Sequence, residues 1–574
     1  MCGPTEEAQN DELDVPKKQV GERREERLSA LRSSYLSVLS KEQRPIEDGE
    51  SDMTDEELEP YRMLGDASMD TVLQLLQKEG HKLGAMDNFL DLAYAANETK
   101  EETKTPSQEA MCTFLKTYEQ IPSWVDKDQL QRGQDVFLAY SPAAALSLYY
   151  RSLVPGFSVP KINAVVMSTA YLTPPARPDQ SLQRILDTGE LLAACIGLGV
   201  NALLPGGIGW KTAIHVRVLH AKIRFALLQR QGKRKWDLAE NGIPINQEDL
   251  SATLLAFSVN VLVGIDLVSG SSVSDQEKLD YLALWRYIGW LLGIETKCDD
   301  DNDNDNDDPN ASLANPRLPG EPSLEELPPL DPCGPPPSPS PSSSLLQLTA
   351  QSDEDNRKAS VSRNPIQRSF ALLQSIVNHL GDPNETSVKI AHHLLKVTDR
   401  LPPKGISNNN NNNKNNSNKT NEEELLFQFY TNRLFYYRSY QCRKFIGDPL
   451  ADALELPFHP NPWTRRSIAL SSSISWFLFR CYTLLGMKVP FVRKWMVRFH
   501  GRGMVHFHQL WNKTYESKMA KLMEVRQSMA GILGLSRNAA TTSTTKPSKQ
   551  DTKSNSTNQS SSMCPFAMIA PPTQ

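Results

Sequence analysis

A histidine inside a predicted helix is the residue of this chain with the clearest capacity for chemistry. In the stretch WKTAIHVRVLHAKIRF (residues 210–225), helical spacing places His220 on one stripe with four apolar residues: Ala213, Val216, Ile223 and Leu227. Its imidazole is then the single polar group on an apolar face, and a buried polar group without a partner is costly. The partner is either a carbonyl or hydroxyl of a neighbouring helix or a metal ion, and helical proteins commonly hold haem iron through such a histidine.

The helix predicted just before it adds a cation and a hydroxyl. Arg184 and Thr188 follow one another at helical spacing and share a stripe with Leu191 and Cys195. A guanidinium stays charged and donates hydrogen bonds in a planar fork. Arg184 therefore suits a carboxylate such as a haem propionate, or a bound oxygen species. A salt bridge to an Asp or Glu of a neighbouring helix is the structural alternative.

Six short motifs occur in a fixed order along this part of the chain. They are PSWVD (122–126), RGQDVF (132–137), RILDTG (184–189), VRVLHAKIR (216–224), GIPINQEDL (242–250) and LWRYIGWLLGI (284–294). Their order and spacing resemble the family that joins latex clearing protein, the rubber oxygenase, with the endoplasmic-reticulum-bound oxygenase of mycophenolic acid biosynthesis. The resemblance covers residues 115–296 and extends only loosely to the C-terminal helices.

The resemblance implies a globin-like helical core that holds haem b. It implies that His220 is the axial ligand of the iron, that Arg184 orients a propionate or bound oxygen, and that Thr188 assists Arg184. The implied enzyme is a haem-dependent oxygenase that uses dioxygen on an unsaturated hydrophobic substrate, isoprenoid or lipid-like, and cleaves a C=C bond. Haem supplies the oxygen chemistry, and the protein supplies the ligand, the pocket and the access path.

The chain departs from the family at two places. In characterised rubber oxygenases the residue just before the threonine is a lysine, and this lysine can close the distal iron position. In this chain that position is Asp187, which is counted among the candidate catalytic residues. An upstream glutamate that serves those enzymes as a base has no counterpart in residues 162–172. Both departures favour one alternative, a non-catalytic haem-binding sensor with the same pocket. A second alternative is a helical membrane-associated scaffold without a cofactor.

Composition and periodicity predict an all-α fold with long disordered insertions, and the resemblance implies a globin-like helical core with extra helices. Strand signals are scarce, and helical periodicity recurs. Segments that bury too little apolar surface to offset chain entropy are 1–55, 297–365, 403–422 and 536–574. The blocks 56–296, 366–402 and 423–535 then form one domain. Its predicted helices are 109–119, 128–150 with a turn, 181–200, 211–229, 247–268, 275–292, 367–380, 386–398, 422–446, 465–485, 489–500 and 506–530.

Positive charge is concentrated near the C-terminus. The formal net charge of the chain is −6, but residues 463–530 hold twelve Lys and Arg against only Glu516 and Glu524. A basic, aromatic-rich helical block predicts a solvated face beside an acidic partner or a peripheral contact with an anionic membrane. Nucleic acid is not an expected partner, since no zinc-finger, RNP or helix-turn-helix pattern occurs.

Three long apolar runs are expected to be buried core helices rather than membrane spans. Residues 191–210 contain five Gly and a Pro, residues 250–265 are short for a span, and residues 467–492 are interrupted by Arg480 and Lys488. The charged N-terminus lacks the apolar region of a secretory signal, and the eight cysteines lack CxxC spacing. Both features predict an intracellular protein with free thiols.

The remaining motifs exclude several classes of enzyme. There is no GxSxG, P-loop, HExxH or dinucleotide fingerprint, so hydrolase, kinase and nicotinamide-dehydrogenase chemistry has no residue support. The three histidines of FHGRGMVHFH, which are His500, His506 and His508, fit a basic surface face better than a metal site. His215 is expected to be solvated.

Overall fold

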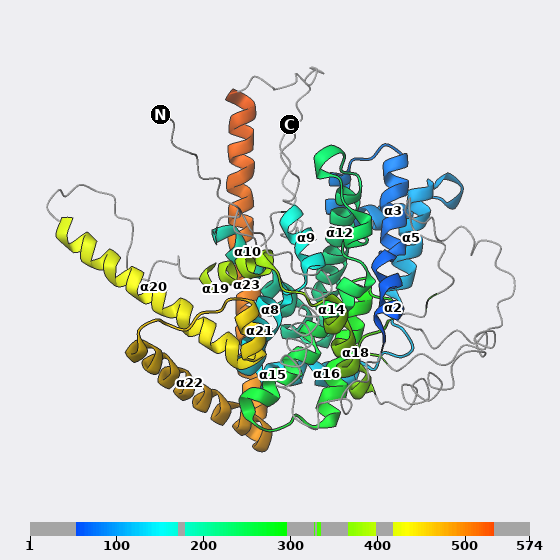
Figure 1. Cartoon of the computed structure of the whole chain (residues 1–574). Coiled ribbons are helices and arrows are strands. Elements are labelled where there is room, and N and C mark those ends of the chain that lie inside the picture. The colour runs from blue at the N-terminus through cyan, green and yellow to red at the C-terminus, as the bar shows by residue number, and fades with distance from the viewer. Residues whose placement is uncertain are drawn as a thin grey trace, which may run out of the picture.

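The structure is a computed structural model that describes residues 53–169, 178–295, 327, 330–334, 365–397 and 417–532, without side chains for 83, 85, 87, 178–180, 233, 417–431 and 512–532. Within these ranges every regular element is a helix and no strand occurs, so the all-α prediction is confirmed. Figure 1 shows the helices packed around one another, with the labelled N-terminal and C-terminal helices on different sides of the body. Most of the segments predicted to be disordered lie outside the described residues.

The N-terminal layer consists of short helices. They are α2 (Asp55–Leu58), η1 (Glu59–Met63), α3 (Ala67–Lys78), η2 (Leu83–Asn88), α4 (Phe89–Glu98), η3 (Glu101–Thr103) and α5 (Pro106–Glu119). Of these helices, only α5 was predicted from the sequence. Local signals for two of them are clear. Asp66 caps α3 by accepting from the Met69 amide, and Thr105 forms a capping box with Gln108 before α5.

Two helices at the centre approach each other unusually closely. They are α6 (Lys127–Ala139) and α16 (Asp275–Leu291). A Cβ atom on Gly133 would lie 2.4 Å from the Asp280 carbonyl oxygen and 2.8 Å from Cβ of Leu284. Glycine at this position therefore sets how near the two backbones can come.

Replacing Gly133 with alanine is expected to lower the free energy of unfolding by about 2 kcal/mol, because the added methyl overpacks a rigid helix contact. Chemical denaturation followed by circular dichroism measures the change. Gly84→Ala is the matched control, since a Cβ there would meet nothing within 4 Å. Equal midpoints for the two variants would contradict the close contact.

The central helices place the residues of the candidate site. They are α7 (Ser141–Ser147), η4 (Leu148–Leu153), α8 (Val154–Gly156), α9 (Pro160–Ser168), α10 (Pro178–Leu192), η5 (Ala193–Gly197), α11 (Val200–Leu203), α12 (Ile208–Leu228), η6 (Gly232–Arg234), α13 (Leu238–Asn241), α14 (Gln247–Phe257) and α15 (Val259–Ser269). The single helix predicted over 247–268 is wrong, because the chain breaks at Ser258, whose hydroxyl donates to the Leu254 carbonyl at 2.9 Å.

The second half adds α18 (Pro365–Leu380), α19 (Glu385–Lys396), α20 (Ser417–Ile446) and α21 (Asp448–Ala453). Part of the predicted insertion 297–365 belongs to the core, because Leu330, Asp331 and Cys333 are buried. Arg368 donates to the carbonyls of Leu330 and Asp331, at 2.7 Å each. The predicted Asn-rich linker also extends too far, since α20 begins before residue 422.

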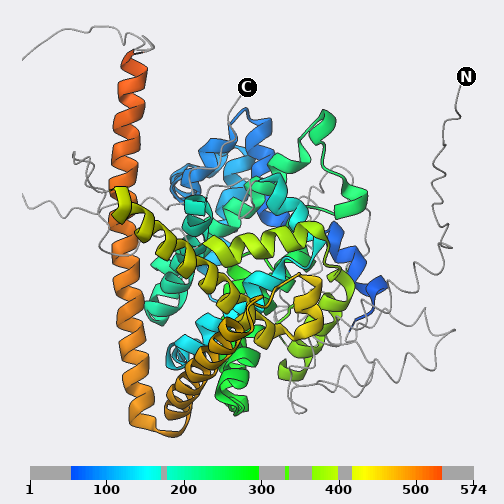
Figure 2. The same cartoon turned by 60° about the vertical axis from the view of Figure 1, so that its left-hand side comes forward.

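Two long helices end the described part of the chain, α22 (Pro462–Lys488) and α23 (Pro490–Ile532). Figures 1 and 2 show α23 as a long rod that runs beside the helical body and projects past it. The predicted break between residues 500 and 506 is wrong, because α23 continues through Gly501 and Gly503. The expectation that residues 467–492 are buried is also wrong. Among the described residues, two stretches are long and apolar enough to cross a membrane; Pro462–Lys488 is mostly exposed, whereas Gln247–Ser269 is mostly buried.

Candidate functional site

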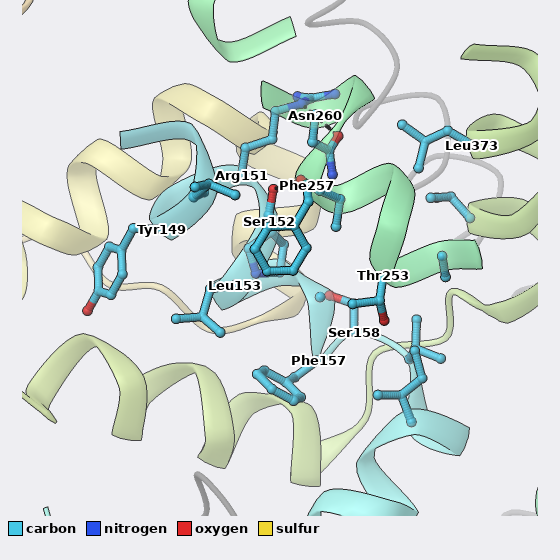
Figure 3. Close-up of a pocket in the computed structure, with 18 of the residues that line it drawn as sticks. Tyr149, Arg151, Ser152, Leu153, Phe157, Ser158, Thr253, Phe257, Asn260 and Leu373 are labelled. Atoms are coloured by element: carbon cyan, nitrogen blue, oxygen red, sulfur yellow. Dashed lines mark hydrogen bonds between the residues drawn. The ribbon is translucent and has the colours of Figure 1, made fainter. Parts of the chain in front are cut away.

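A cavity of about 480 Å³ lies among η4, α8, α9, α10, α14 and α18 (Figure 3). Its wall is almost wholly apolar and includes Phe157, Ile185, Leu192, Phe257 and Leu373. Such a wall excludes water and favours an apolar ligand.

Most polar groups on the cavity wall are already paired within the protein. Arg151 donates from Nε to the Asn260 side chain at 3.1 Å and from Nη1 to the Phe445 carbonyl at 2.8 Å. The Ser152 hydroxyl donates to the Ala256 carbonyl at 2.7 Å. These hydrogen bonds fix the wall and leave it with little capacity to bind a charged ligand.

Ser158 is the exception among the described polar residues of the wall. Its side chain is buried, and its hydroxyl has no hydrogen-bond partner in the structure. An unpaired buried hydroxyl is costly, so a ligand oxygen in the cavity would find a donor there. Ser158, Arg151 and Asn260 were not predicted as site residues, because no sequence motif marks residues that meet only through packing.

Thr188 is the predicted site residue that lines the cavity. Its hydroxyl donates to the Arg184 carbonyl one turn earlier at 3.1 Å. Arg184 and Asp187 lie on the same helix, with 3.7 Å between a guanidinium nitrogen and a carboxylate oxygen. Asp187 is buried and accepts from the Gln183 amide at 3.0 Å. This pair lies within α10, whereas the structural alternative for Arg184 was a salt bridge to a neighbouring helix.

His220 lies on α12, which packs against α10, but it is not among the residues that line the cavity. The residue is half-buried, and its Nδ1 is inaccessible and has no hydrogen-bond partner within the described chain. Burial and the nearby Arg224 charge lower the pKa of His220 to about 4. The imidazole is therefore neutral at physiological pH, which is the form that binds iron. The hydrogen bond expected of an ordinary core histidine is not found at Nδ1.

The face of α12 that carries His220 is not apolar, contrary to the prediction. Arg217 and Arg224 precede and follow His220 on the same side of the helix, and both are buried. Arg217 donates to both carboxylate oxygens of Asp66, at 2.6 and 2.7 Å, and Arg224 donates to Asp70 at 2.5 Å. Two buried ion pairs therefore bracket His220 and fix α12 to the start of α3.

The two carboxylates respond differently to burial. Burial alone would raise the pKa of Asp66, but the charge and hydrogen bonds of Arg217 outweigh it and hold this pKa below its ordinary value. For Asp70, burial prevails over the Arg224 charge and raises the pKa to about 6. Asp66–Arg217 is thus the firmly ionised pair of the two.

A strained turn connects α12 with the cavity wall. Arg224 donates to the carbonyls of Pro244 and Ile245, at 3.2 and 3.0 Å. Ile245 has a φ of 56°, a left-handed conformation that costs a β-branched residue about 1–3 kcal/mol. The next residue, Asn246, caps the N-terminus of α14, and the C-terminal half of α14 lines the cavity. The GIPINQEDL motif therefore couples the His220 helix to the cavity through backbone contacts.

The C-terminal histidines do not form one ligand set. His508 pairs with the buried Glu190 of α10, whereas His500 bonds the Leu138 carbonyl at 2.6 Å and the Tyr482 hydroxyl at 3.2 Å. In the part of the chain that is described, no group of three or more His, Cys, Asp or Glu side chains could hold a metal ion. His215 is half-buried, not solvated, with Nδ1 2.7 Å from the Lys211 carbonyl.

Comparison with known proteins supports the resemblance that the motifs indicated. Residues 156–306 match the family model described as "ER-bound oxygenase mpaB/B'/Rubber oxygenase, catalytic domain". No curated protein matches the chain. One similar solved structure is "Structure of Latex Clearing Protein LCP in the closed state", at 16% identity and a TM-score of 0.43, covering 77% of this chain and 91% of that one. This likeness is too low to carry over any residue from that structure.

Proposed function

We propose, from the premise that residues 156–306 match the catalytic-domain family of ER-bound oxygenase mpaB/B' and rubber oxygenase, that this chain is a haem b-dependent oxygenase. Its substrate is an unsaturated hydrophobic molecule, isoprenoid or lipid-like, and the reaction is oxidative cleavage of a C=C bond by dioxygen. The observation that carries the proposal is the apolar cavity, three of whose walls, α9, α10 and α14, come from the matched segment.

The residue that best fits haem binding is His220, which offers a neutral imidazole with an inaccessible, unpaired Nδ1 on a helix fixed by two ion pairs. His220 does not line the cavity, so a haem on His220 and a substrate in the cavity would occupy separate spaces. Haem bound there would supply the oxygen chemistry. His220 would be its axial ligand, and Arg184, whose side chain is partly exposed, would bind a propionate.

The chain's own contribution is then to bind and shield the substrate. The apolar wall would hold a hydrocarbon chain away from water, with Phe157 and Phe257 as its largest flat surfaces. Thr188 would hold its hydroxyl at the α10 edge of this space, and Ser158 would donate to an oxygen of the substrate or product.

Filling the cavity is expected to abolish turnover and leave the fold intact. Ala256 lies on the wall and is half-buried, so Ala256→Trp would occupy space that the substrate needs. Oxygen uptake with a polyprenyl substrate is expected to fall by about tenfold or more, because the substrate loses its near-attack position. The control is Ala95→Trp, which adds the same ring at an exposed position of α4 and is expected to keep full oxygen uptake.

The sensor alternative makes a different prediction for the same assay. It is favoured by Asp187, a buried carboxylate at the position where the family resemblance calls for a lysine. A sensor would bind haem, yet oxygen uptake would stay at the background rate with every polyprenyl substrate. An enzyme would consume oxygen in proportion to substrate, and its products would carry new carbonyl groups.

A further inference from the structure

The largest exposed apolar side chains of the described chain gather on α22 and α23. Six lie on α22 and four on α23. The six that are nearest in sequence to the junction of the two helices define the α22–α23 surface: Phe477, Leu478, Leu485, Phe491, Trp495 and Phe499. Phe491 is 75% exposed and Phe477 is 64% exposed. Apolar side chains of this size that cluster on one surface mark an interaction site.

The charge of the α22–α23 surface has one sign. No Asp or Glu occurs between Glu455 and Glu516. Exposed cations lie between and beside the apolar residues: Arg480, Lys488, Lys494, Arg498 and Arg502. Aromatic rings combined with cations and without acids match the interface of an anionic bilayer, where rings enter the headgroup region and cations meet phosphate.

The packing of α22 decides how it would meet a bilayer. Its opposite side is buried at Ile468, Ser472, Thr483 and Gly486, and the helix packs against α15, α20 and α23. For α22 to cross the bilayer, the helices packed along its buried side would have to enter the lipid with it or detach from it. Only its exposed side is free, as for a helix that lies in the membrane plane.

The α22–α23 surface is also connected to the cavity wall, through contacts between α23 and α10. α23 contacts α10 through the pair of His508 with Glu190 and through Phe507, whose ring lies 3.5 Å from where a Cβ of Gly189 would be. Gly189 lines the cavity. The helix that bears half of the surface thus supports a wall of the cavity.

We propose that the α22–α23 surface docks the protein, in the plane of the membrane, onto an anionic phospholipid bilayer. The inserted rings contribute apolar burial, and the cations contribute attraction to acidic headgroups. This docking does not depend on haem or on turnover, so its failure would leave the proposed oxygenase untouched.

Vesicle flotation of the full chain tests the proposal. Vesicles of phosphatidylcholine with phosphatidylserine are expected to carry the protein, and binding is expected to weaken about tenfold or more without phosphatidylserine or at high salt. Two triple variants, F491S/W495S/F499S and K494E/R498E/R502E, are each expected to lose about tenfold or more in affinity.

Matched controls separate this surface from general stickiness. Met167→Ser removes an exposed apolar residue elsewhere, and K78E/K82E/K116E reverses as many exposed charges in the N-terminal layer. Both are expected to bind like the unaltered chain. The proposal is overturned if the unaltered chain does not float with acidic vesicles, or if alkaline carbonate fails to release it, as for a spanning helix. A dimer that F491S/W495S/F499S dissolves, with no vesicle binding, would assign the surface to a second copy of the chain.

Discussion

His220→Ala is expected to lower the haem content of the purified protein by about tenfold or more, with the helical content retained. The loss follows because the variant removes the only imidazole that the account assigns to iron. The fold is retained because the His220 side chain makes no hydrogen bond to its surroundings at Nδ1 and is neutral at pH 7, so its removal leaves no buried charge unpaired. Pyridine haemochrome quantitation per chain gives the first quantity, and far-ultraviolet circular dichroism gives the second.

His215→Ala is the matched control, because His215 lies on the same helix and its ring bonds only locally to the Lys211 carbonyl. It is expected to keep its haem. If His220→Ala retained full haem occupancy, or if both variants lost haem equally, His220 would not be the ligand.

Arg217→Met is expected to destabilise the protein by about 3–5 kcal/mol. The substitution leaves Asp66 buried without its two short hydrogen bonds, and it also removes a guanidinium that lies 4.3 Å from the ring centre of Tyr118. The expected consequence reaches the site, because this pair fixes α12 beside His220. Denaturation midpoints with and without added haemin measure the effect on stability and on haem binding together.

Two further variants give this prediction its controls. Lys389→Met breaks the exposed pair between Lys389 and Glu385 and is expected to leave the midpoint unchanged, since solvent screens such pairs. The double variant D66N/R217M removes both charges and is expected to recover part of the lost stability. A stability of Arg217→Met equal to that of Lys389→Met would show that the buried pair contributes nothing.

Much of the fold could be predicted from periodicity, because the long helices have one apolar side. The range predicted for α12, for example, differs from the observed one by three residues at its start and one at its end. The short helices α2 to α4 were missed, since their apolar stripes are brief and their caps, such as Asp66, are single residues. The exposed side of α22 was also missed, because an apolar sequence does not state whether protein covers it.

The candidate site was only partly predictable for the same reason. The ordered motifs around Thr188 and His220 indicated a family that the comparison supports for residues 156–306. The helical stripe alone, however, did not predict the two buried arginines beside His220. They can be buried on a face that was expected to be apolar because they pair with Asp66 and Asp70, some 150 positions away in the sequence. Cavity residues such as Ser158 meet Thr188 only in three dimensions.

The proposed function depends on iron held by the His220 imidazole of α12, and an absorption spectrum of the purified full-length chain tests this most directly. We expect a Soret band and a pyridine haemochrome yield near one haem b per chain after supply of haemin. A folded, helical protein that shows no Soret band under those conditions would contradict the account.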